Sequence, residues 1–99
     1  MLNIYIMDSD DVLKDAIELW DENTQINMAS EGAAELILTI SRYFRGRCNK
    51  NDIAEKVADV QIMIDQLKII IGEEEVNQIQ DQKLERTKNA VRKTKNDRH

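Results

Sequence analysis

The sequence predicts an all-α fold, a bundle of four helices. It has no proline and only three glycines among 99 residues, a composition that disfavours sheets and long loops. Apolar residues recur three and four positions apart over long stretches, as on one face of a helix. We therefore expect one domain over residues 1–99, with an arm at 1–8, a helical bundle at 9–91 and a frayed basic tail at 92–99. A chain this short buries little of its surface alone, so we also expect a partner subunit.

The first helix is expected to end at about Asp21. Asp8, Ser9 and Asp10 each offer a side chain that can accept a hydrogen bond from its first turn. Trp20, the only tryptophan, lies near its end. It is interpreted either as an anchor in a core or subunit interface or as one wall of a base-binding pocket. Residues before this helix are apolar and are expected to form an arm that packs on a neighbour.

The second and third helices carry the widest apolar patterns and are expected to form the core. A cap at Asn23 or Thr24 is predicted to open the second helix. Gly46 is predicted to end it, because glycine readily adopts the left-handed conformation found after helices. The basic loop that follows is short, so the third helix must double back. Its cap is predicted at Asn51 or Asp52.

Gly72 is predicted to end the third helix and Glu73, Glu74 and Glu75 to begin a fourth. Negative charge suits the positive end of the helix dipole. The apolar stripe of this helix is thinner than those before it, so we expect the helix to lie at the periphery. From about Arg92 onward we expect fraying.

The charge of the chain is unevenly distributed. The formal net charge is −5. Residues 83–99 hold seven basic and two acidic residues, a net +5, whereas residues 1–82 hold seven basic and seventeen acidic residues, a net −10. An acidic body makes nucleic acid an unlikely partner. The basic end is interpreted as solvated, with an anionic partner as the alternative.

Nothing in the sequence indicates a membrane protein or a disulfide-stabilised one. Cys48 is the only cysteine, so no disulfide can form within the chain. No apolar run is long enough to span a bilayer, and the apolar start lacks the basic leader of a secretory signal. We therefore expect a cytoplasmic protein with no membrane partner.

Four carboxylates lie in pairs on the two central helices. Glu31 and Glu35 are four residues apart, as are Glu55 and Asp59, so each pair occupies one helix face. If the helices pack antiparallel, the four acids can converge. Such a cluster needs positive charge nearby: a metal ion, a bound cation or a lysine. Lys56 lies between the members of the second pair and could supply it.

These helices resemble the MazG-like branch of the all-α nucleoside triphosphate pyrophosphohydrolases. The likeness covers roughly residues 11–72 and rests on the stretches QINMASEGAAELILTISRYFRG and NDIAEKVADVQIMIDQLKIIIG, with Trp20 and Gln25 at positions where the family commonly has the same residues. The resemblance implies a bundle that works as a homodimer or a dimer of dimers through its central helices. It also implies that four carboxylates in an EExxE and an ExxD motif hold Mg²⁺ (or Mn²⁺), and that an NTP is split to NMP and pyrophosphate.

Two of the four ligand positions implied by the resemblance hold other residues here. Gly32 stands where the second glutamate of EExxE is expected, and Lys56 where the glutamate of ExxD is expected. The ammonium of Lys56 could replace the metal, but it cannot act as a Lewis acid for water. A displaced metal could instead use acids one residue earlier. The candidate catalytic and metal-binding residues are therefore Glu31, Glu35, Glu55 and Asp59.

Several basic residues are candidates for binding phosphate. Arg42 and Arg45 lie near the end of the second helix, where a guanidinium could donate to phosphate oxygens. The alternative is that they simply complement the negative end of the helix dipole. Together the candidate nucleotide-binding residues are Trp20, Lys56, Arg42 and Arg45.

We expect a MazG-like protein that binds a nucleotide or a nucleotide-derived signal, with hydrolysis lost or weakened, and that sequesters or senses its ligand. An active metal-dependent pyrophosphohydrolase is one alternative. A structural module whose dimer is its function is another. If the enzyme is active we expect Mg²⁺ or Mn²⁺ as cofactor, and otherwise none.

Overall fold

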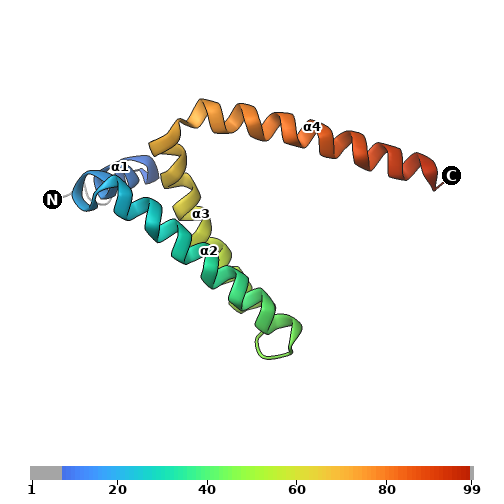
Figure 1. The fold of residues 1–99 in the computed structure, drawn as a ribbon, viewed down its shortest axis with the longest axis horizontal. Coiled ribbons are helices and arrows are strands. Elements are labelled where there is room, and N and C mark those ends of the chain that lie inside the picture. Colours follow the sequence, from blue (N-terminus) through green and yellow to red (C-terminus); the bar gives the residue numbers. More distant parts are fainter. Residues whose placement is uncertain (1–7, 99) are drawn as a thin grey trace.

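The chain folds into four α-helices (Figure 1). The computed structural model describes residues 8–98, and this part contains no strand. The helices are α1 (Ser9–Trp20), α2 (Glu22–Phe44), α3 (Lys50–Ile71) and α4 (Glu73–Asp97). The predicted all-α class and the number of helices are confirmed for the described residues. The predicted arm at residues 1–8 lies outside them except for Asp8, which caps α1.

The α2–α3 hairpin is the centre of the structure (Figure 1). The two long helices run antiparallel, and α1 packs against both of them at the end away from the hairpin loop. Helix α4 leaves the end of α3 at an angle and extends away from the hairpin. Within residues 8–98, α3 is the only helix that α4 contacts. The candidate residues on α2 and α3 therefore face each other across one long helix pair.

Helix α1 begins as its sequence predicts. Asp8 is the N-cap residue, and its Oδ1 accepts a hydrogen bond of 2.9 Å from the backbone N–H of Asp11. Asp10 and Asp11 add negative charge to the first turn, which the helix dipole favours.

The joint between α1 and α2 is a single residue, Asp21. Its φ is 74° and its ψ 139°, a backbone conformation that residues with a Cβ rarely adopt. Because the chain turns in one residue, α2 begins at Glu22 without a side-chain cap. The predicted cap at Asn23 or Thr24 is wrong, since both residues already lie inside the helix.

The hairpin loop contains one confirmed and one wrong prediction. Gly46 has a φ of 71° after the end of α2, as expected for the glycine that follows a helix. Helix α3, however, is capped by Asn49 rather than by Asn51 or Asp52. Asn49 Oδ1 accepts from the backbone N–H of Asp52 at 3.1 Å, and the backbone N–H of Asn49 donates to Asp52 Oδ2 at 2.9 Å. This reciprocal pair is a capping box, which satisfies two donors together and so fixes the start of the helix.

Helix α4 is longer than expected. Gly72, with a φ of 130°, separates it from α3 as predicted. The helix then continues to Asp97, past Arg92 where we expected fraying.

The described part of the chain encloses no apolar core of its own. Within residues 8–98 no apolar side chain is fully buried; the buried residues are Gln25, Thr39 and Gln66. Large apolar side chains on α2 are instead exposed, Phe44 by 81% and Ile37 by 69%. Over residues 8–98, none of the helices has the length and apolar character needed to cross a bilayer.

Candidate functional site

An acidic pocket lies between α2 and α3 near the middle of the hairpin. We call it the hairpin pocket; its lining residues are Met28, Glu31, Gly32, Glu35, Asp59, Ile62 and Met63. Both helices contribute carboxylates and apolar side chains to this lining. The register set by Glu35 and Lys56 places the carboxylates toward the hairpin loop and Met28, Ile62 and Met63 further from it. Three of the four carboxylates predicted from the sequence therefore line one pocket. The fourth, Glu55, is not among the lining residues.

Lys56 and Glu35 connect the two helices across this region. The Nζ of Lys56 donates to Glu35 Oε2 at 3.3 Å, and the two side chains are 34% and 60% exposed. This is the only ion pair between different helices within residues 8–98. The lysine that was predicted to neutralise the acids does contact one of them. Because both groups are solvated, the pair contributes only about 0.2–1 kcal/mol to stability.

The carboxylates do not gather closely enough to form a metal site in one copy of the chain. Over residues 8–98, no group of three or more His, Cys, Asp or Glu side chains is arranged to hold a metal ion. Magnesium requires near-octahedral oxygen ligands at about 2.0–2.1 Å. The Glu31, Glu35 and Asp59 side chains share a pocket but do not meet this requirement.

Gly32 lies where α2 faces α3. A Cβ built on it would lie 3.9 Å from Met63 Cγ and 3.9 Å from Val60 Cγ2, which is ordinary van der Waals contact. The Cβ atom of a larger side chain at position 32 would therefore cause no clash. The backbone conformation at position 32 does not require glycine.

The other predicted nucleotide-binding residues lie at the ends of the helices, outside the hairpin pocket. Trp20 ends α1 and is 62% exposed, so it is not a core anchor within one copy. Arg42 is in the last turn of α2 and Arg45 is its C-cap residue. None of these three lines the hairpin pocket.

Sequence reasoning missed the apolar part of the pocket lining, which is made by Met28, Ile62 and Met63. Met28 precedes Glu31 and Gly32 by three and four positions, and Ile62 and Met63 follow Asp59 by the same spacings. Residues with these spacings share a helix face, so the signal was present in the sequence.

A second missed feature is a pair of buried glutamines. Gln25 on α2 and Gln66 on α3 are each 3% exposed. The antiparallel register that pairs Glu35 with Lys56 places them at the same level, because each is equally far along its helix from that ion pair. Gln25 Nε2 and Gln66 Oε1 are buried without a hydrogen-bond partner.

Cys48 makes a hydrogen bond within the hairpin. Its Sγ donates to the backbone carbonyl of Thr39 at 3.3 Å. The contact ties the loop to the last turns of α2.

The chain was compared with known proteins, and no family model, characterised protein or solved structure matches it.

Proposed function

We propose that this chain is a nucleotide-binding protein of MazG-like type in which Lys56 takes the place of a metal ion, so that hydrolysis is lost or weakened. The observation that carries the proposal is the contact of Lys56 Nζ with Glu35 Oε2 at 3.3 Å beside the hairpin pocket. An ammonium there offsets part of the acidic charge that a divalent cation would otherwise balance. It supplies no Lewis acid to activate water.

The acidic and the apolar parts of the hairpin pocket suit the two ends of a nucleotide. Met28, Ile62 and Met63 offer apolar and polarisable surface on which a base can lie. Lys56 has donors left after its bond to Glu35 and can contact a phosphate oxygen. Arg42 and Arg45, further along the same hairpin, can extend this cationic side toward a longer phosphate chain.

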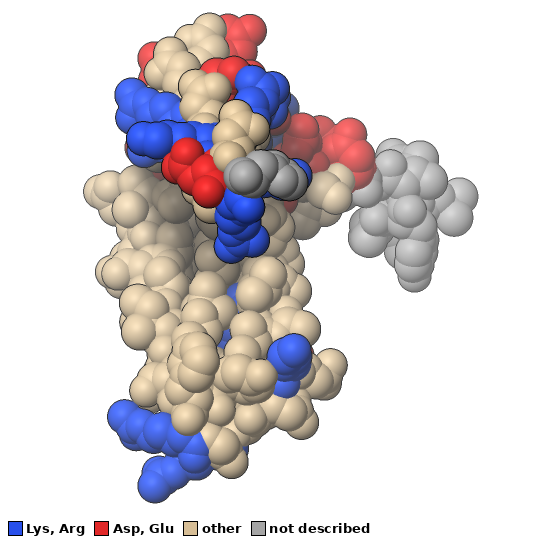
Figure 2. Space-filling view, turned by 90° about the vertical axis from the view of Figure 1, so that its right-hand side faces the viewer, with Lys and Arg blue, Asp and Glu red and all other residues tan. Residues whose placement is uncertain are grey.

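A complete site requires more than one copy in this proposal. The exposed apolar side chains of α2 and α3 would be covered by the same helices of a second chain, as a dimer or a dimer of dimers. Covering one large apolar side chain contributes about 1.5–3 kcal/mol. Figure 2 supports such a contact, because the visible face of the hairpin below α4 is mostly uncharged, with Lys and Arg mainly at its lower end and edge and no Asp or Glu in view.

Titration calorimetry with each NTP, NMP and NDP, with and without Mg²⁺, tests the binding proposal. We expect at least one nucleotide to bind, and we expect Lys56→Met to weaken binding. Lys50→Met is the matched control, because Lys50 lies on the same helix but makes no ion pair with Glu35, whereas Lys56 does. If the two variants weaken nucleotide binding equally, Lys56 has no specific role in binding and the proposal is wrong on this point.

Pyrophosphate release from the same nucleotides tests the loss of hydrolysis. We expect little or no turnover by the natural chain. Rapid turnover that disappears in both Glu35→Gln and Asp59→Asn would establish the alternative, an active metal-dependent pyrophosphohydrolase. The presence of Glu31, Glu35 and Asp59 in one pocket is the observation that favours this alternative.

A structural interaction module is the third candidate. It is favoured by the absence of any fully buried apolar side chain over residues 8–98. If no nucleotide gives a calorimetric signal and the chain still assembles, this candidate replaces the first.

A further inference from the structure

Helix α4 carries an apolar stripe that is exposed among the described residues 8–98. Ile79, Leu84 and Val91 are 52%, 50% and 47% exposed. The helix has 25 residues and is about 37 Å long at 1.5 Å per residue. Isolated helices are marginally stable in water, and most protein helices depend on packing of their apolar side. A partner for α4 is therefore needed on physical grounds.

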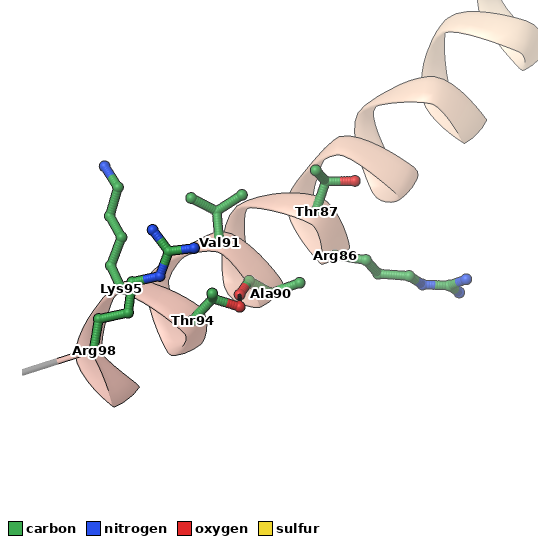
Figure 3. A pocket seen from close by; sticks show the side chains of 7 residues that line it. All are labelled: Arg86, Thr87, Ala90, Val91, Thr94, Lys95 and Arg98. Carbon is green, nitrogen blue, oxygen red and sulfur yellow. Dashed lines mark hydrogen bonds between the residues drawn. The ribbon is translucent and has the colours of Figure 1, made fainter. Parts of the chain in front are cut away.

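Three shallow surface pockets that share lining residues follow one another along α4 from the elbow at α3 to the tip of the helix, and we call the surface they occupy the α4 groove. Near the elbow the groove is lined by α3 residues, including Ile64, and by α4 residues up to Leu84 and Thr87. Thr87 also lines the next stretch toward the tip, together with Val91. Figure 3 shows the last stretch, with basic side chains extending from the helix around Val91. The groove is long enough to receive another helix.

The charge of α4 is split between its two halves. Residues 73–82 hold four acidic residues and no basic one, a net −4. Residues 83–98 hold seven basic and two acidic residues, a net +5. A second α4 running parallel would place like charges side by side. If the second α4 runs antiparallel, the acidic half of each helix lies against the basic half of the other. The two contacts are related by a two-fold axis.

We propose that α4 pairs antiparallel with α4 of a second copy of this chain. The contact is self-complementary, as a two-fold interface requires. The acidic α1 segment of a second copy is the competing occupant, because residues 8–22 hold seven acidic residues and one basic residue. It would neutralise only the basic half of α4 and would leave the acidic half without a counterpart. The pairing is independent of the proposed nucleotide site, which lies on α2 and α3.

Distances between spin labels on two copies test the orientation. Single cysteines at Arg86, near the middle of α4, and at Asn96, near its tip, are labelled in a Cys48→Ser background and measured by pulsed electron paramagnetic resonance. In an antiparallel pair the Arg86→Cys labels lie about 10–20 Å apart and the Asn96→Cys labels about 30 Å or more apart, from the rise per residue and the spacing of packed helices. Short distances at both positions would mean a parallel pair. The absence of a short distance at Arg86→Cys would mean that another surface covers α4. Either result overturns the proposal.

A charge reversal tests the electrostatic argument. Glu74→Lys/Glu75→Lys places positive charge in the acidic half, and we expect the fraction of paired α4 helices at a given concentration to fall severalfold. Asp10→Lys/Asp11→Lys is the matched control, because it makes the same charge change in the first turn of another helix. An equal loss of pairing in both variants would contradict the assignment of the acidic half to the contact.

Discussion

If the proposed function is right, introducing two carboxylates into the hairpin should create a magnesium site. The perturbation is the double variant Gly32→Glu/Lys56→Glu, which adds three units of negative charge beside Glu35 and Asp59. The structure tolerates the first change, because a Cβ at Gly32 meets only side chains at 3.9 Å. The second change removes the ammonium that contacts Glu35 at 3.3 Å.

The magnitude follows from Coulomb's law. Changing Lys56 to glutamate alters the charge by two units, and a divalent ion about 5 Å away gains about 3 kcal/mol at the dielectric constant of water. Screening at physiological salt reduces this gain to about 2 kcal/mol. Because 1.4 kcal/mol corresponds to a tenfold change in affinity, the change at Lys56 alone should tighten the binding of Mg²⁺ or Mn²⁺ about ten- to a hundredfold, and the carboxylate at position 32 should tighten it further.

The assay is titration calorimetry with Mn²⁺ and Mg²⁺, supported by water-proton relaxation for Mn²⁺. Lys56→Met is the intermediate control, since it removes one charge and adds no ligand. Glu74→Gln, on α4, checks that the effect is local. A double variant that binds metal no more tightly than the natural chain would refute the assignment of Gly32 and Lys56 to ligand positions.

Four further predictions concern stability, each measured by thermal or urea unfolding. Gly32→Ala should stabilise the chain by about 0.5–1 kcal/mol, because glycine inside a helix loses more backbone entropy than alanine; destabilisation would mean that the helices cannot accept a methyl group there. Asp21→Gly should raise the unfolding temperature by relieving a φ of 74°, whereas Asp21→Val should lower it. The double variant Gln25→Leu/Gln66→Leu should be more stable than either single variant, because each single change leaves the other amide buried with an atom that has no hydrogen-bond partner; a double variant no more stable than the single variants would contradict this. Unfolding temperature should rise with protein concentration, since no apolar side chain over residues 8–98 is fully buried in one copy.

The helical periods and the glycines predicted the fold well because both are local signals. Gly46 and Gly72 have positive φ at the ends of α2 and α3, as their positions in the sequence indicate. The cap of α3 was missed because Asn49 and Asp52 act together, and single residues were weighed one at a time. The joint at Asp21 was missed because an aspartate with positive φ has no distinctive sequence signal.

The site was predicted in part, for a different physical reason. Spacing along a helix correctly placed Glu31 beside Glu35, but the face on which Glu55 lies depends on how α3 is rotated against α2. That rotation is set by packing between helices. The contact between Lys56 and Glu35, which crosses from one helix to the other, was foreseen from charge balance and not from spacing.

The contribution of the Lys56–Glu35 ion pair to stability and to phosphate binding depends on whether a second copy covers the hairpin. In one copy the two side chains are 34% and 60% exposed, and water screens their attraction. A second copy that covers the apolar surface of α2 and α3 would also exclude water from the hairpin. In that drier setting, removing one partner leaves an uncompensated charge, and the cost rises above that of a surface pair. The same change would strengthen the attraction of Lys56 for a phosphate oxygen. In this proposal the association of the helices is therefore part of what makes the lysine an effective substitute for a metal ion.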